Sequence, residues 1–183
     1  KTKELMKSLP FPLTTGNFNE NKFGQKDVLN DLVIDMMDGK RVNALVQGDV
    51  GCGKTIVAFL LMMVLAENGY QSVLLAPTLV LAKQHFTELC SYMEKFGYKV
   101  GFLSGEMKKT EQNKVIKDVK NGEIDMLVGT HAVLNDSIEY KNLGIAIIDE
   151  EHKFGVLQRN KLSFPGIHKV SMSATPIPRS LAM

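Results

Sequence analysis

The stretch from Gly48 to Thr55 carries the residue types that bind phosphate groups. It reads Gly48-Asp49-Val50-Gly51-Cys52-Gly53-Lys54-Thr55 and fits the pattern G-x-x-x-x-G-K-[ST], between a short apolar run and a helical one. Glycines let the backbone curl so that successive N–H groups face phosphate oxygens, and the following helix presents its positive end to them. We expect Lys54 to reach the β- and γ-phosphates and Thr55 to hold a magnesium ion. The alternative is a glycine-rich turn that binds nothing.

A second cluster of reactive side chains follows the apolar run from Leu143 to Ile148, where the chain continues Asp149-Glu150-Glu151-His152. A carboxylate at the carboxyl end of a buried strand is placed to bind magnesium, directly or through water, and we assign this role to Asp149. Glu150 beside it can orient and polarise an attacking water. Alone, such a cluster is more often an exposed acidic turn. Together with the phosphate-binding stretch it predicts an ATPase site.

An alternation of strands and helices must position these two clusters. Short apolar runs without polar alternation are typical of parallel strands that are covered on both faces. The predicted strands are Ala44–Gln47, Ser72–Ala76, Lys99–Leu103, Ile124–Val128, Ile145–Ile148 and Lys169–Met172. The predicted helices are Gln25–Met37, Thr55–Glu67, Leu79–Phe96 and Lys108–Lys120. The pattern predicts an α/β fold of three layers around a mainly parallel sheet, whose ligands bind at the carboxyl ends of the strands.

Composition limits the remaining possibilities. A chain of 183 residues with 44% hydrophobic content can bury one sizeable core. The net charge of +2 neither requires nor excludes nucleic acid. The 2 cysteines form no disulfide framework, no signal peptide is visible, and the apolar run from Ile56 to Ala66 is shorter than the roughly 20 residues that span a bilayer. We therefore expect a cytoplasmic location with no membrane partner. Because the chain begins with Lys1 and stops at Met183 within a helical pattern, we expect a piece of a longer protein.

Asp149-Glu150-x-His152 resembles the DExH box of superfamily 2 helicases, and the closer likeness is to the RecG branch-migration helicases and the transcription-repair coupling translocases. The likeness spans Leu9 to Met183. The other matching strings are Gly48 to Thr55, Ala76-Pro77-Thr78, Leu81-Ala82-Lys83-Gln84-His85, Gly122-Glu123-Ile124-Asp125, Val128-Gly129-Thr130-His131-Ala132, Phe154-Gly155-Val156-x-Gln158-Arg159 and Met172-Ser173-Ala174-Thr175-Pro176-Ile177-Pro178-Arg179. The chain departs from the family at Glu151, where Gln is usual. It also departs in spacing: the family's Leu-Thr pair and its adenine-side Gln are normally close together, whereas here an Asn-rich loop separates Leu13-Thr14 from Gln25.

The resemblance implies a RecA-like domain that binds ATP and Mg²⁺. Residues 25–183 would form the first motor lobe of an ATP-dependent DNA helicase or translocase active in repair and recombination, preceded by a linker over residues 1–24. Lys54, Asp149, Glu150 and His152 would be its catalytic residues, and Gln25 would recognise adenine. A second RecA-like lobe of the same parent chain would supply the arginine that completes the site. We therefore expect these residues alone to hydrolyse ATP poorly.

The same resemblance implies contacts with branched or duplex DNA. Pro77, Thr78 and Gln84 belong to one candidate region, and Gly129, Thr130 and His131 to a second. Each region follows a strand, so its N–H and hydroxyl groups lie where a DNA phosphate could be held. The structural alternatives are a helix start capped by Thr78 and a hydrogen-bonded loop histidine at position 131. Ser173, Ala174 and Thr175 would connect His152 to the DNA-facing edge.

Other functions remain open at this point. A translocase that displaces stalled polymerase would use the same chemistry but needs a partner-binding domain. A P-loop kinase or small-molecule ATPase would need an acceptor pocket and an arginine-rich lid, and the chain shows neither. A non-catalytic binding module would leave Lys54, Thr55, Asp149 and Glu150 without a role. The lysines at 108, 109, 114, 117 and 120 are expected to form a solvated helix face.

Overall fold

The computed structural model describes residues 43–47, 54–134, 138–150, 153–154 and 167–173. Its strands are β1 (Asn43–Gln47), β2 (Gln71–Leu75), β3 (Val100–Leu103), β4 (Met126–Gly129), β5 (Leu143–Asp149) and β6 (His168–Ser173). Its helices are α3 (Lys54–Glu67), α4 (Leu79–Met93) and α5 (Lys109–Asn121), with short 3₁₀ turns η2 (Glu94–Phe96) and η3 (His131–Leu134).

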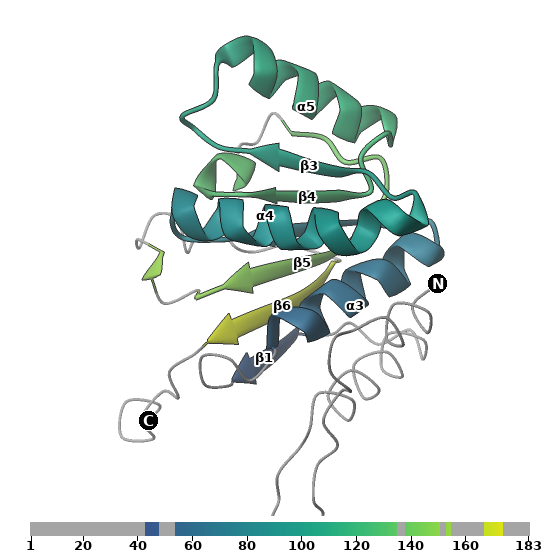
Figure 1. Cartoon of the computed structure of the whole chain (residues 1–183), viewed down its shortest axis with the longest axis vertical. Coiled ribbons are helices and arrows are strands. Elements are labelled where there is room, and N and C mark those ends of the chain that lie inside the picture. Colours follow the sequence, from purple (N-terminus) through teal and green to yellow (C-terminus); the bar gives the residue numbers. More distant parts are fainter. Residues whose placement is uncertain (1–42, 48–53, 135–137, 151–152, 155–166, 174–183) are drawn as a thin grey trace, which may run out of the picture.

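The described strands form one sheet in the order β1-β6-β5-β2-β4-β3 (Figure 1). Every pairing in it is parallel. The carboxyl ends of the strands therefore lie along a single edge of the sheet. At this edge, the register pairs Gln47 with Ser173 and Asp149 with Met172. The prediction of a mainly parallel α/β sheet is confirmed.

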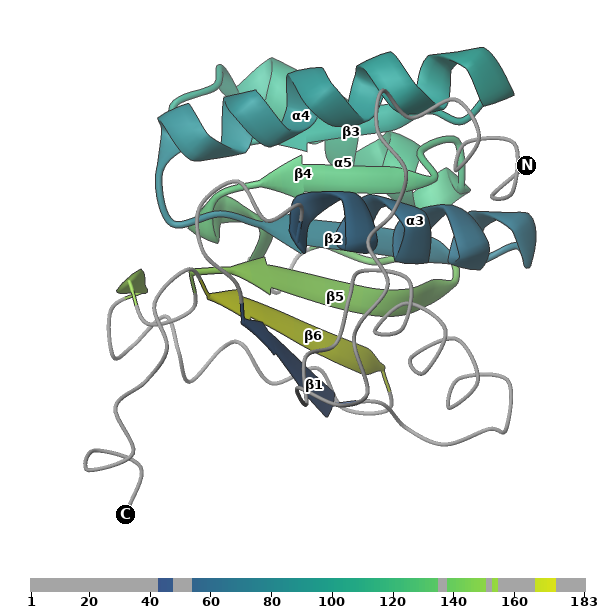
Figure 2. The same ribbon diagram turned by 60° about the horizontal axis from the view of Figure 1, so that its bottom comes forward.

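Helices cover both faces of the sheet. One face packs against α3 and α4 through a cluster that includes Leu60, Leu89 and Ile147. The other face packs against α5 and η3 through residues such as Val119, Val133 and Ile148. Figure 2 shows the two layers on opposite sides of the strands. Because neighbouring residues of a strand point to opposite faces, Ile147 and Ile148 pack against different helical layers.

The helix α3 is buried on almost all sides. Every side chain from Ile56 to Met63 is buried. Phe59 of this helix packs against Tyr92 of α4 with ring centroids 6.1 Å apart. A helix that is apolar on all sides is stable only when it lies within the core. No helix among the described residues is long and apolar enough to cross a membrane.

Most predicted boundaries agree with the structure to within two residues. The helix expected over Leu79–Phe96 changes to a 3₁₀ turn after Met93, and the left-handed Gly97 (φ 77°) ends that turn. The strand expected over Ile124–Val128 begins later, at Met126, because the Asp125 backbone N–H bonds to the Lys99 carbonyl in the connection before the ladder. The helix expected over Gln25–Met37 lies outside the described residues.

Gln71 joins three connections at the opposite edge, where the strands begin. Its side chain is buried, and its Nε2 donates to the carbonyl oxygens of Val119 (2.9 Å) and Ile124 (2.8 Å). Its Oε1 accepts a bond from the Asn142 backbone N–H (3.0 Å). One side chain thus ties the end of α5 and the chain before β4 to the chain before β5.

Candidate active site

The elements that should hold a nucleotide meet at the carboxyl edge of the sheet. The helix α3 begins there at Lys54, β5 ends there at Asp149, and β6 ends there at Ser173. The backbone therefore brings the helix start and the acidic strand end to one edge, although they are far apart in the chain. Residues Gly48 to Gly53, Gln25, His152, Ala174 and Thr175 lie outside the described residues, as do the side chains of Lys54 and Ser173.

Asp149 and Glu150 are both buried, with exposed fractions of 4% and 7%. Glu150 adopts a left-handed backbone conformation, with φ 51°. Its N–H donates to the Met172 carbonyl (2.9 Å) and its own carbonyl accepts from the Lys153 N–H (2.8 Å). A non-glycine residue in this conformation costs on the order of 1–3 kcal/mol and persists where the surroundings hold it. These two bonds hold the backbone of Glu150 in this turn at the end of β5.

The Asp149 carboxylate has a partner that sequence analysis missed. Its Oδ2 lies 2.7 Å from Nε2 of His85, a residue of α4, and both side chains are more than nine-tenths buried. Because a carboxylate can only accept, His85 donates through its Nε2–H. His85 belongs to the string Leu81 to His85 that carried the resemblance, but its contact with Asp149 crosses 64 positions. The sequence feature that could have singled out His85 is its position in a helical stripe whose other residues are apolar.

The second oxygen of Asp149 suits a cation. Asp149 Oδ1 is buried and has no hydrogen-bond partner in the part of the chain that the structure describes. A buried carboxylate oxygen without a donor is costly, and a magnesium ion or one of its waters would satisfy it. The same residues contain no group of three or more His, Cys, Asp or Glu side chains that could hold a metal by itself. Such a site fits magnesium, which binds through one or two carboxylates together with substrate phosphates.

The first candidate DNA region begins α4. Thr78 is the N-cap of this helix, and its hydroxyl oxygen accepts a bond from the Leu81 N–H (3.3 Å). The capped helix start, the structural alternative for Thr78, is therefore present. A hydroxyl that accepts this bond still has its own hydrogen to donate, so the cap is compatible with a phosphate contact. Pro77 is half-buried and Gln84 is exposed on the same helix.

The second candidate region ends β4 and is more buried. Gly129 lies against β3, because a Cβ atom at this position would come 2.1 Å from the Leu103 carbonyl oxygen. Thr130 is buried, and its backbone N–H donates to the same carbonyl (3.2 Å). His131 is exposed at the start of η3. Gly129 thus has a packing role, whereas His131 is the accessible side chain of the three.

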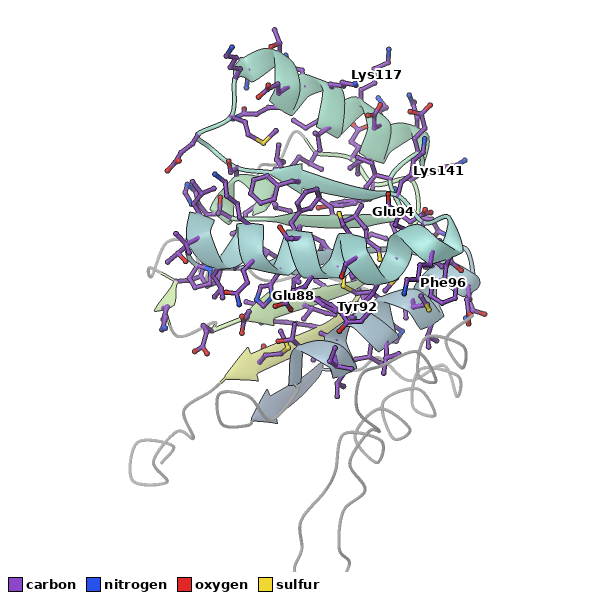
Figure 3. All side chains as sticks on the ribbon, viewed as in Figure 1. Glu88, Tyr92, Glu94, Phe96, Lys117 and Lys141 are labelled. Atoms are coloured by element: carbon purple, nitrogen blue, oxygen red, sulfur yellow. The ribbon has the colours of Figure 1, made fainter. Side chains whose placement is uncertain are left out.

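The remaining groups are structural or solvated. Phe102 packs against Phe86 with ring centroids 5.4 Å apart, and Phe154 is buried in the core, so neither ring is exposed for stacking on a base. The lysines 108, 109, 114, 117 and 120 are all exposed. Figure 3 shows Lys117 pointing away from the sheet on α5. The prediction of a solvated lysine face is confirmed.

Comparison with known proteins places this geometry in a family. The model of the DEAD/DEAH box helicase family matches residues 24–183. The chain is 42% identical over 182 residues to the ATP-dependent DNA helicase RecG of Thermotoga maritima, covering 98% of this chain and 22% of the relative. It is 44% identical over 180 residues to that of Bacillus subtilis, covering 97% and 25%. The chain thus spans about a quarter of the length of these relatives.

Solved helicase structures have the same fold. A structure of RecG bound to a three-way DNA junction superimposes with a TM-score of 0.79 at 40% identity, covering 98% of this chain and 23% of that one. A hypothetical ATP-dependent RNA helicase from Sulfolobus tokodaii shares the fold at 19% identity, with a TM-score of 0.68 over 99% of this chain and 52% of that one. With a matching family model over residues 24–183 and an acidic strand end on the same sheet edge as the start of α3, the chain belongs to the DEAD/DEAH box helicase family.

Proposed function

We propose that this chain is the first motor lobe of an ATP-dependent DNA helicase of the RecG type, which moves on branched or duplex DNA in repair and recombination. Residues 25–183 form the lobe and residues 1–24 precede it as a linker. The observation that carries the proposal is the buried Asp149 carboxylate, with one oxygen unpartnered among the described residues, on the edge where α3 begins at Lys54.

The proposed nucleotide site draws on both halves of this edge. Backbone N–H groups of Gly48 to Thr55 hold the phosphates of ATP, and Gln25 recognises its adenine. Thr55 and Asp149 hold the magnesium ion, which when bound neutralises charge on the β- and γ-phosphates. Lys54 stabilises the transferring phosphate, and Glu150 orients the water that attacks it. His152 follows Glu150 by two residues and couples the occupancy of the nucleotide site to Ser173, Ala174 and Thr175.

The proposed DNA contacts are to the phosphate backbone. The relative solved with a three-way DNA junction supports DNA as the partner. Pro77 and Thr78 lie just before α4, Gln84 lies within its first two turns, and Gly129 to His131 lie at the end of β4, on the carboxyl side of the sheet. Phosphate contacts hold a strand without reading its sequence, as movement along any sequence requires.

A second lobe of the same parent chain would close over the nucleotide. The relatives are about four times as long as the matched segment, which leaves room for such a lobe and for accessory domains. A translocase of the transcription-repair coupling type would use the same lobe chemistry. The family match favours a helicase motor over a P-loop kinase.

The test uses the full-length protein and the variant Lys54→Ala. ATP turnover should fall by at least about 100-fold, because a preorganised positive charge on the transferring phosphate is lost. The matched control is Lys114→Ala, an exposed lysine on α5, which should keep wild-type turnover. Turnover is measured without DNA, with linear duplex and with a branched junction, while circular dichroism checks folding. Unaltered turnover in Lys54→Ala would remove the phosphate-binding stretch from the mechanism.

A further inference from the structure

His85 is a polar residue in an apolar position. The buried residues of α4 are Ala82, His85, Leu89 and Met93, which lie along one face of the helix against the sheet. In this stripe a leucine would pack without any polar group to satisfy. Burying an imidazole is costly unless it is hydrogen-bonded, and replacing both partners of a buried hydrogen bond by apolar groups of the same shape can be nearly neutral or stabilising. Packing alone therefore does not explain a histidine here.

The polar contact that the structure gives His85 is to Asp149. Its Nε2 lies 2.7 Å from Asp149 Oδ2, while its Nδ1 is buried without a partner among the described residues. The contact thus occupies one carboxylate oxygen and leaves the other, Oδ1, with no donor from the part of the chain that the structure describes. Since a carboxylate is planar, fixing one oxygen also limits where the second can lie.

His85 also contacts the helix that follows the phosphate-binding stretch. Its ring meets the ring of Phe59 on α3 edge to face, with centroids 6.5 Å apart and planes at 88°. The imidazole is therefore held between α3, α4 and the end of β5. A side chain packed on two sides cannot turn freely, so it can hold the carboxylate in one orientation.

We propose that His85 is the positioning residue for Asp149: it holds Oδ2 so that Oδ1 is presented to the magnesium ion. This inference rests on the proposed function, which makes Asp149 a magnesium ligand. It also connects that ligand to α4, because His85 lies seven residues after the cap Thr78, a rise of about 10 Å along a helix. A DNA phosphate held at the start of α4 would then act on the same rigid element that holds the metal-binding carboxylate.

The test measures how much Mg²⁺ the full-length protein needs to bind a fluorescent, non-hydrolysable ATP analogue. His85→Leu removes the hydrogen-bond donor and puts an apolar side chain in its place. His85→Asn places an amide near the position of Nδ1, and His85→Gln places one near the position of Nε2. Partners that orient metal ligands are typically worth 10–100-fold in metal affinity, so His85→Leu and His85→Asn should raise the half-saturating Mg²⁺ concentration by at least about 10-fold. His85→Gln should remain close to the wild type.

Two further variants separate the possible explanations. Leu89→Ala, in the same buried stripe, should lower thermal stability without changing the Mg²⁺ requirement, because leucine has no hydrogen-bond donor for the Asp149 carboxylate. Asp149→Asn should raise the Mg²⁺ requirement directly. The inference on His85 is wrong if Asp149→Asn raises the requirement and His85→Leu and His85→Asn do not, or if His85→Gln is as impaired as both. If Asp149→Asn itself changes nothing, the assignment of Asp149 as a magnesium ligand fails, and the inference fails with it.

Discussion

Replacing Gln71 by Met tests how much one side chain stabilises the edge of the sheet at which the strands begin. Met has nearly the same length and volume, so the substitution removes the hydrogen bonds while it keeps most of the packing. Three bonds are lost, to the carbonyls of Val119 and Ile124 and from the N–H of Asn142. All three partners are backbone groups, and of these the Val119 carbonyl keeps a second bond, from the Gly122 N–H (3.1 Å).

The size of the effect follows from these contacts. A typical intramolecular hydrogen bond contributes about 1 kcal/mol net, and a buried group left without a partner costs about 1–3 kcal/mol. Gln71 is only 6% exposed, so water cannot replace all three bonds. We expect Gln71→Met to lower the free energy of unfolding by about 3 kcal/mol. For a chain of this size that corresponds to a fall in Tm of about 6–12 °C.

The assay is urea and thermal unfolding of the chain, followed by circular dichroism. Asn68→Ala is the matched control, because it removes one side chain–backbone bond, from Nδ2 to the Val64 carbonyl (2.7 Å), at an exposed position. It should change stability by no more than about 0.5 kcal/mol. A loss in Gln71→Met no larger than in Asn68→Ala would refute the reasoning, since burial would then add nothing to these bonds.

Two further substitutions test packing and burial elsewhere. Gly129→Ala should cost about 1–3 kcal/mol or more in urea unfolding, because its Cβ would meet the Leu103 carbonyl oxygen at 2.1 Å. Gly105→Ala, whose Cβ would have nothing nearer than 4.0 Å, should be tolerated, and equal losses would contradict the steric argument. The Tyr140 hydroxyl is buried without a partner among the described residues, and this burial raises its pKa. The free energy of unfolding of Tyr140→Phe should therefore match or slightly exceed that of the wild type at neutral pH. Above about pH 10 the variant should lose less stability, because the tyrosine of the unfolded wild type ionises before that of the folded protein. A larger loss of stability at alkaline pH in Tyr140→Phe than in the wild type would show that the hydroxyl is not desolvated.

The sequence predicted most of the fold because its apolar runs are short, continuous and separated by clear helices. The buried runs before Asp149 and after Tyr70 are strands in the structure, as expected. The end of α4 was less predictable, because Glu94, Lys95 and Phe96 continue a helical pattern while the chain tightens into a 3₁₀ turn before Gly97. Local preference does not distinguish these two conformations over three residues.

The site was predictable only in part. Glycines, a lysine and acids at strand ends are recognisable because each has a local chemical reason for its position. The partner of Asp149 is not local: His85 comes from another helix, and no spacing along the chain relates the two. A polar residue on the buried face of a predicted helix is the kind of conflict that marks a functional position. Gln71 is also a buried polar residue where an apolar one would be expected, but its role is structural, because its side chain bonds to backbone groups of three connections.

The place of β6 in the sheet has a consequence for biosynthesis. β1 is the first described strand to be made, and its neighbour in the sheet is β6, the last. As the nascent chain leaves the ribosome, β2 to β5 can pair with one another while β1 waits for a strand more than a hundred residues downstream. Such long-range pairing forms late and slowly. β1 therefore gains its described neighbour in the sheet only after β6 has been made, so a nascent chain that ends before β6 leaves β1 without that partner.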